Sequence, residues 1–173
     1  VLVPDGSREV VPGSGEVGMV AQGGMVPLGY YKDPEKSAKT FKEVDGKRYA
    51  FIGDMATVEA DGTINLLGRG SNCINTGGEK VFPEEVEEAL KLHADVADAL
   101  VFGLEDERFG NRVAGVVSLE QGRSAEAGDI LEATRKLLAS YKLPKDLLVV
   151  PVVPRAPNGK ADYKTAKSMM TGD

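Results

Sequence analysis

Two different periods of apolar and polar positions run along the chain and divide it into two parts. In the first part apolar residues alternate with polar ones over short stretches, which is typical of half-buried strands. The clearest stretches are 55–60 and 63–67, on either side of Asp61-Gly62, a favoured two-residue hairpin turn. The pattern also predicts short strands at Val1–Val3 and over 17–21.

One short helix is expected in this first part. Asp33 can accept a hydrogen bond from the first helical turn, and Pro34 suits the first helical position. Two thirds of the 21 glycines lie before residue 79, which favours strands and turns over long helices there.

The second part has longer apolar periods, typical of amphipathic helices that alternate with buried strands. The pattern predicts a helix from Pro83 to His93, strands over 96–104 and 112–119, a helix over 130–141 that ends before Pro144, a strand over 147–153 and a helix over 162–170. The order indicates an α+β fold. We therefore predict a small β-rich subdomain in residues 1–68 and a compact α+β domain in residues 69–173, with a junction in the stretch Leu67–Ser71.

Composition excludes several classes of protein. The chain has 21 Lys and Arg against 27 Asp and Glu, a net charge of −6, which argues against nucleic-acid binding. No apolar run reaches the roughly 18 residues that a membrane span needs. A single cysteine fits a reducing, cytoplasmic compartment, and a single histidine leaves no His-based metal cluster. The sequence starts at Val1 without Met, so we expect a piece of a longer protein.

Several features have structural explanations. Residues 13–18 match G-x-G-x-x-G, but no helix pattern follows, so we expect a turn between strands and not a dinucleotide site. His93 is expected to be a semi-buried structural residue and Cys73 a small buried one. The acidic run is expected to be a solvated helix face; it contains Glu84, Glu85, Glu87 and Glu88.

Two segments are typical of ligand binding. The stretch 68–83 is rich in glycine, so its backbone N–H groups can approach an anion, and it leads into the helix at Pro83. The stretch Pro154–Lys160 contains Pro-Asn-Gly, a tight turn that presents Lys160 at its tip. A lysine in that place can neutralise phosphate or carboxylate oxygens.

In this order, the segments resemble motifs of the adenylate-forming superfamily, which contains acyl-CoA synthetases, peptide-synthetase adenylation domains and luciferases. Tyr49–Asp54 resembles the ribose-binding motif, Gly68–Glu87 the hinge motif, and Pro157–Lys160 the catalytic-lysine motif. Gly29–Pro34 matches a stretch that usually precedes them. The hinge motif is most similar to fatty-acyl and steroid-acid CoA ligases of actinobacteria, which implies lipid metabolism.

The resemblance implies a two-step reaction. A carboxylate attacks the α-phosphate of ATP to give acyl-AMP and pyrophosphate, and CoA then displaces AMP. Asp54 would bind the ribose hydroxyls, Arg69 would contact the nucleotide, and Lys160 would stabilise the adenylation transition state. Ser71, where the family usually has Asp or Lys, would be the hinge of a mobile C-terminal domain. Gly77, Gly78 and Glu79 would line the pantetheine channel after rotation.

The resemblance also implies what this chain lacks. The family's phosphate loop and its Mg²⁺-binding glutamate would lie upstream of Val1, so no metal ligand is assigned here. The expected partners are the missing N-terminal domain, ATP, CoA and an acyl substrate, with a homodimer as a further possibility. We expect residues 1–173 alone to be inactive. Two alternatives stay open: a non-catalytic CoA- or nucleotide-binding or interaction module, and a piece of a peptide-synthetase adenylation domain.

Overall fold

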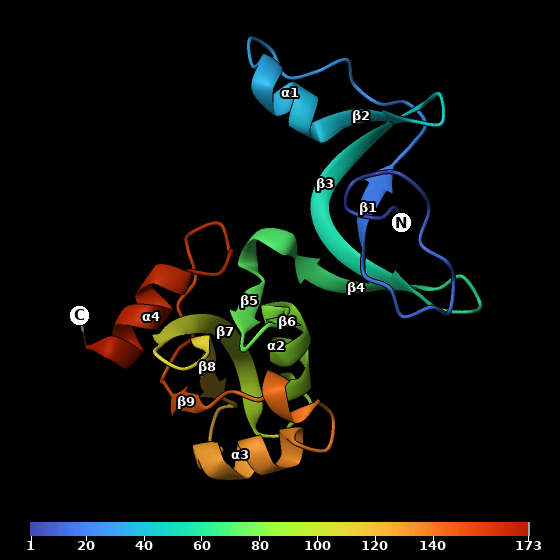
Figure 1. Cartoon of the computed structure of the whole chain (residues 1–173). Helices are drawn as coiled ribbons and strands as arrows, with labels where there is room; N and C mark the ends of the chain where they lie inside the picture. Colours follow the sequence, from blue (N-terminus) through green and yellow to red (C-terminus); the bar gives the residue numbers. More distant parts are fainter. Residues whose placement is uncertain (173) are drawn as a thin grey trace. The chain divides into compact units, whose positions relative to one another are not determined.

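The chain divides after Ser71, as the computed structural model shows for its described residues, 1–172 (Figure 1). This division lies at the end of the predicted junction Leu67–Ser71, three residues after the predicted boundary at residue 68. The structure continues the first unit because the strand β4 (Ile64–Arg69) runs on to Arg69, which pairs with Asp54. A single turn of 3₁₀ helix, η1 (Gly70–Asn72), follows that strand.

The first unit is an antiparallel sheet with one short helix. Its elements are β1 (Gly18–Gln22), α1 (Pro34–Thr40), β2 (Phe41–Val44), β3 (Lys47–Val58) and β4. The long, curved β3 lies between β1 and β2 and also pairs with β4 (Figure 1). Every other strand of the unit is therefore in contact with β3, which contains the segment Tyr49–Asp54.

Local chemistry explains the elements that the sequence predicted in this unit. Asp33 accepts a hydrogen bond from the backbone N–H of Lys36 at 3.0 Å and caps α1. The turn at Asp61-Gly62 joins β3 and β4, with the Glu59 N–H donating to the Thr63 carbonyl at 2.8 Å. The helix and the hairpin are confirmed, but the two-residue turn is wrong: Glu59 lies opposite Thr63, so three residues, Ala60 to Gly62, form the loop, and only Gly62 has positive φ.

Two predictions for this unit were incomplete. Val1–Val3 forms isolated bridges from Leu2 and no strand. The sequence analysis also missed the hairpin between β2 and β3, whose turn is Asp45-Gly46 with φ of 49° and 72°. Positive φ at both central residues is the geometry that an Asp-Gly turn favours, so the signal was present in the sequence.

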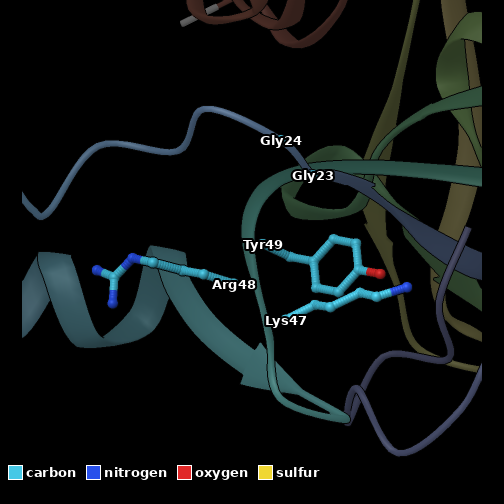
Figure 2. Close-up of a pocket in the computed structure, with 5 residues that line it drawn as sticks. All are labelled: Gly23, Gly24, Lys47, Arg48 and Tyr49. Atoms are coloured by element: carbon cyan, nitrogen blue, oxygen red, sulfur yellow. The ribbon is translucent and has the colours of Figure 1, made fainter.

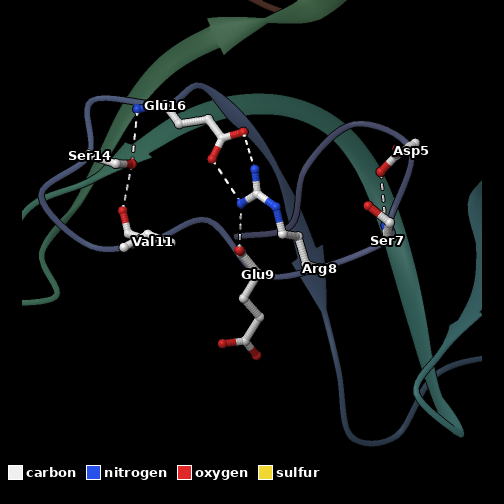
Figure 3. A network of polar contacts seen from close by, with 7 residues as sticks. All are labelled: Asp5, Ser7, Arg8, Glu9, Val11, Ser14 and Glu16. Atoms are coloured by element: carbon white, nitrogen blue, oxygen red, sulfur yellow. Dashed lines mark hydrogen bonds and ion pairs between the residues drawn. The ribbon is translucent and has the colours of Figure 1, made fainter.

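The G-x-G-x-x-G segment is a turn that leads into β1, as expected (Figure 3). The Arg8 guanidinium donates to both carboxylate oxygens of Glu16, at 2.9 and 2.7 Å, and fixes the segment from one side. Ser14 Oγ donates to the Val11 carbonyl at 2.6 Å and accepts from the Glu16 N–H at 3.2 Å. A Cβ on Gly18 would lie 2.6 Å from the Leu2 carbonyl oxygen, so this glycine permits close backbone packing.

The second unit is a five-stranded sheet covered by helices on both faces. Its strands are β5 (Ile74–Thr76), β6 (Glu79–Val81), β7 (Val96–Asp106), β8 (Gly110–Leu119) and β9 (Asp146–Val149). Its helices are α2 (Pro83–Lys91), α3 (Ala127–Thr134) and α4 (Tyr163–Thr171), with a 3₁₀ turn η2 (Ser140–Lys142). The strand order is β6-β5-β8-β7, and β9 pairs in parallel with β8.

The alternation of side chains along β7 divides the core in two. Ala99 and Val101 pack in a cluster with residues of α2 and α3, among them Leu90 and Ile130. Leu100 and its alternate neighbours pack in a second cluster; its members are Leu100, Phe102, Leu104, Ala114, Val116, Val150, Val153 and Ala166. Because successive strand side chains point to opposite faces, α2 and α3 cover one face of the sheet and α4 covers the other.

The α+β class and the predicted order of six elements are confirmed, but two lengths were wrong. The helix expected over 130–141 ends at Thr134, whose hydroxyl donates back to the Ile130 carbonyl at 2.8 Å. Tyr141 is 42% exposed, and Leu138 reaches the core from a turn. The strand expected over 147–153 ends at Val149, and Val152 is exposed. Among the described helices, none combines the length and apolarity of a membrane span.

Candidate functional site

Asp54 and Arg69 face each other across β3 and β4 in the first unit. They are directly opposite in the antiparallel register, and Arg69 Nε lies 3.2 Å from Asp54 Oδ1. The Asp54 side chain is 24% exposed and that of Arg69 is 62% exposed, so both reach solvent. Gly53, with φ of 86°, gives the strand a left-handed residue directly before the carboxylate. A carboxylate held in this way keeps lone pairs that can accept hydroxyl hydrogen bonds.

Ser71 lies in η1, directly after the strand that carries Arg69. It is exposed and is the last residue of the first unit. Next to it, a Cβ on Gly70 would lie 3.3 Å from the Met55 side chain, so the turn passes close to β3. The predicted hinge residue therefore lies at the division between the units, and its role as a hinge stays a prediction.

Gly77 and Gly78 form a tight turn between β5 and β6, and Glu79 begins β6. Their φ angles of 59° and 91° are left-handed, as a two-residue hairpin turn needs. The Gly77 N–H donates to the Phe109 carbonyl at 3.0 Å, and a Cβ on Gly77 would meet the Phe109 ring at 3.1 Å. This side of the turn is packed, whereas a Cβ on Gly78 would meet open space.

A cavity of about 230 Å³ opens beside this turn, entirely within the second unit. Phe109, Tyr141 and Lys145 contribute to its wall together with Gly77 and Glu79. The Lys145 ammonium lies 3.8 Å from the centre of the Phe109 ring, a cation–π contact. Sequence reasoning missed this wall because it placed Tyr141 on the buried face of a helix.

Lys160 lies at the exposed end of a turn whose backbone is closed by hydrogen bonds. The Ala156 N–H donates to the Lys160 carbonyl at 2.8 Å, and the Lys160 N–H donates to Asn158 Oδ1 at 3.1 Å. Arg155 and Ala161 form an antiparallel bridge at the base of the turn. Within the described part of the second unit, the Lys160 ammonium takes part in no ion pair, so its charge is available to a ligand.

The acidic run of α2 is not the uniformly solvated face that the sequence suggested. Glu85 accepts from Lys142 Nζ at 2.6 Å, which ties α2 to η2. Glu87 accepts from the Val101 N–H at 2.9 Å, and burial raises the pKa of this carboxyl to about 7. Glu88 is exposed beside Lys91 and does match the expectation. Packing against the rest of the second unit, and not the sequence of the helix, decides which of these carboxylates is partly removed from solvent.

The lone histidine and cysteine have structural surroundings. His93 follows α2, and its Nδ1 accepts from the Asp95 N–H at 3.2 Å. Cys73 is half-buried, and burial raises the pKa of its thiol, so the reactive thiolate is disfavoured.

A second hollow, of about 330 Å³, lies in the first unit (Figure 2). It is lined by Gly23, Gly24, Lys47, Arg48 and Tyr49. Figure 2 shows Arg48 extending away from Lys47 and Tyr49, and its guanidinium donates to the Pro27 and Leu28 carbonyls at 3.3 and 2.7 Å. Asp54 and Arg69 do not line it, so this hollow is distinct from the predicted nucleotide contacts.

The predicted site residues thus fall into two groups. The structure brings Asp54 and Arg69 together in the first unit. Lys160 and the Gly77–Glu79 turn lie at the surface of the second unit on separate loops. Ser71 ends the first unit.

Comparison with known proteins finds similar sequences. Residues 85–160 match the AMP-binding enzyme C-terminal domain. The chain is 52% identical, over 96% of its length, to 3-oxocholest-4-en-26-oate–CoA ligase of Rhodococcus rhodochrous. It is 51% identical, over 98% of its length, to a medium/long-chain-fatty-acid–CoA/3-oxocholest-4-en-26-oate–CoA ligase of Mycolicibacterium smegmatis. It spans 30% and 31% of these two relatives.

Solved structures of similar fold include two enzymes bound to a nucleotide or an acyl-adenylate. ATP-bound MatB from Rhodopseudomonas palustris aligns with a TM-score of 0.79 and 29% identity, over 95% of this chain and 32% of that one. The o-succinylbenzoate CoA synthetase MenE from Bacillus subtilis, in complex with the acyl-adenylate OSB-AMP, aligns with a TM-score of 0.80 and 28% identity. That alignment covers 92% of this chain and 31% of MenE. Residues 85–160 of the second unit are therefore similar to the AMP-binding enzyme C-terminal domain, and the chain is similar to part of the CoA ligases in sequence and to part of MatB and MenE in fold.

Proposed function

We propose that this chain is the C-terminal part of an ATP-dependent acyl-CoA synthetase. The complete enzyme would join a carboxylic acid to CoA through acyl-AMP, with release of pyrophosphate and then AMP. The observation that carries the proposal is the position of Lys160, an exposed ammonium on a turn closed by the Ala156 N–H. The 52% identity to a CoA ligase over 96% of the chain supports the same reaction.

In the adenylation step, Lys160 would contact the substrate carboxylate and the α-phosphate. A fixed positive charge stabilises the transition state more than the ground state, because negative charge develops on the oxygens around the α-phosphorus in the transition state. Asp54 would accept hydrogen bonds from the ribose hydroxyls, and Arg69 beside it would contact the nucleotide. ATP and AMP binding is thereby assigned to the first unit and charge stabilisation to the second.

In the thioester-forming step, the Gly77–Glu79 turn would line the channel of the pantetheine arm. Two successive glycines leave the turn without side chains, so a thin chain can pass close to the backbone. Ser71 would be the residue about which the second unit turns between the two steps. Rotation about a few backbone torsions next to a 3₁₀ turn suits such a change.

The substrate, the metal and the location are further parts of the proposal. The relatives' names favour a fatty or steroid acid as the acyl group. Mg²⁺ would be held by the phosphates of ATP and, as the resemblance implies, by a glutamate outside residues 1–173. We place the enzyme in the cytoplasm, because its substrates ATP and CoA are cytoplasmic metabolites. A homodimer stays a prediction that sedimentation of the complete enzyme would check.

Lys160→Ala in the complete enzyme tests the proposal. We expect acyl-AMP formation, measured by substrate-dependent ATP–pyrophosphate exchange, to fall by about 10²–10³-fold. Lys164→Ala is the matched control, since Lys164 is an exposed lysine four residues away on α4. Unchanged exchange in Lys160→Ala would show that Lys160 is not the catalytic lysine.

A non-catalytic CoA-binding module is the second candidate. The wall of Phe109, Tyr141 and Lys145 beside the Gly77 turn favours it, since an aromatic ring and a cation suit a nucleotide. Calorimetric titration of residues 1–173 with CoA separates the candidates. Sub-micromolar binding would favour the module, whereas the ligase proposal expects one part of a divided site to bind weakly.

A further inference from the structure

The turn that carries Lys160 is fixed internally and is attached to the sheet through its first residue, Arg155. The Gly159 N–H donates to the Ala156 carbonyl at 2.8 Å, and the Ala156 N–H donates to the Lys160 carbonyl at the same distance. Arg155 bridges to Ala161 across the base of the turn. Lys160 therefore moves together with Arg155, because the backbone between them is closed into one unit.

Arg155 is joined to β7 by a pair of parallel hydrogen bonds. Its Nε and one terminal nitrogen donate to the two carboxylate oxygens of Asp98, at 2.8 and 2.7 Å. This bidentate geometry fixes an orientation as well as a distance. Asp98 is itself held, because its Oδ1 also accepts from the Ala99 N–H at 2.9 Å. The result is a rigid link from the core strand β7 to the base of the turn.

The charges around the guanidinium reinforce this link. When it is ionised, Glu87 on α2 acts on Arg155 as a second negative charge, and Asp98 and then Glu87 raise the pKa of Arg155. Arg155 in turn holds the pKa of Asp98 below its usual range. The pair is about one third exposed on each side, and such pairs contribute little to global stability. Its effect should therefore be local, on the turn that it holds.

We propose that the Arg155–Asp98 ion pair is a positioning device that holds the Lys160 turn in its productive place. The proposal rests on the proposed function of Lys160 in adenylation. In this proposal neither Arg155 nor Asp98 contacts the substrate, and both act on Lys160 through the backbone of the turn. A small displacement of a catalytic group costs a large factor in rate, so the link matters for the step that uses Lys160.

The first experiment uses this chain alone and does not depend on the enzyme's activity. Trypsin cleaves after lysine, and the Lys160–Ala161 bond lies in the closed turn. Asp98→Asn keeps the size of the side chain and removes its charge, so we expect faster cleavage at that bond. The matched control is Asp146→Asn, which weakens the Arg112–Asp146 pair on β8 and β9, 2.6 Å long and away from the turn. Equal cleavage rates in the two variants would overturn the proposal.

The second experiment uses the complete ligase. We expect Asp98→Asn to lower kcat for adenylation by about ten- to a hundredfold with little change in KM for ATP. Thioester formation from supplied acyl-AMP should proceed at the wild-type rate. The exchanged pair Asp98→Arg with Arg155→Asp should recover most of the lost kcat, which a variant that merely misfolds would not do.

The outcomes separate this inference from the function on which it rests. If Lys160→Ala retains full adenylation, the proposed function is wrong. If Lys160→Ala loses adenylation while Asp98→Asn behaves like Asp146→Asn, only the positioning role is wrong. Loss of adenylation in Asp98→Asn with recovery in the exchanged pair supports both.

Discussion

Arg69 Nε lies 3.2 Å from Asp54 Oδ1, and the two residues are direct partners in the register of β3 and β4. The pair depends on the hairpin at Asp61-Gly62, which sets which residues of the two strands are opposite. A carboxylate that the sequence associates with the ribose is thus aligned by an arginine that the sequence associates with the same nucleotide.

Asp54→Asn should weaken nucleotide binding by the complete ligase. The amide keeps the shape of the side chain but loses the charge, and hydrogen bonds to charged groups contribute about 1.5–3 kcal/mol. We expect KM for ATP to rise by roughly 10- to 100-fold. Glu43→Gln on β2 neutralises an exposed carboxylate of the same sheet and should leave KM unchanged. Equal KM values for the two variants would remove Asp54 from the nucleotide contacts.

Glu87 should make the stability of the second unit depend on pH. Its folded-state pKa of about 7 is above the ordinary value, so the folded state binds the proton more tightly than the unfolded state. The protonated carboxyl therefore stabilises the folded state: this contribution is complete below the ordinary pKa near 4.5 and is lost as the pH rises through 7. Glu87→Gln resembles the protonated form and should be more stable than wild type at pH 8 by about 2 kcal/mol.

Urea denaturation at pH 5 and pH 8 measures this difference. Glu88→Gln is the control, because Glu88 is an exposed carboxylate on the same helix. The free energy of unfolding of Glu87→Gln should change less between the two pH values than that of wild type. Parallel changes in wild type and Glu87→Gln would contradict the assignment of the raised pKa.

Two glycine substitutions should have opposite signs. Gly77→Ala places a Cβ at a left-handed φ of 59° and 3.1 Å from the Phe109 ring, so we expect a loss of about 1–2 kcal/mol. Gly128→Ala lies in the helix α3 with open space around its Cβ, so we expect a gain of roughly 0.5–1 kcal/mol. Thermal or urea denaturation of both variants checks the signs. Equal effects would show that the Gly77 turn is not strained by a side chain.

Leu90 should be a main support of the second unit. It is fully buried between α2 and the sheet, so Leu90→Ala removes apolar contacts and leaves a cavity. The expected loss is about 2–5 kcal/mol. Leu92→Ala, two residues later and 74% exposed, should cost less than about 0.5 kcal/mol. A small effect of Leu90→Ala would mean that α2 packs less tightly than its burial indicates.

Sequence reasoning succeeded where a local signal decides the structure. The cap at Asp33 and the hairpin around Asp61-Gly62 were both predicted from neighbouring residues, although that loop has three residues and the two-residue turn occurs instead at Asp45-Gly46. It failed at the helix expected over 130–141, because the apolar spacing there continues after the helix ends at Thr134. Leu138 packs against the core from a turn, so the spacing of apolar residues after Thr134 reflects which side chains are buried and does not indicate a helix.

The candidate site shows the same limit. Lys160, Asp54 and Arg69 were selected from motifs, and their roles stay predictions, although the structure does bring Asp54 and Arg69 into contact. The link between Asp98 and Arg155 joins residues 57 positions apart, and no local pattern indicates it. Burial of Glu87 likewise depends on packing against β7, which the sequence of α2 does not contain.

The hydrogen bond from the Val101 N–H to Glu87 also bears on aggregation. The strand β7 is the last in the order β6-β5-β8-β7, so its outer edge has backbone donors that β8 does not use. Such an edge is a template for pairing with a strand from another molecule. Glu87 occupies the Val101 donor at 2.9 Å, so the same half-buried carboxyl leaves this edge one donor fewer to offer to a strand of another molecule.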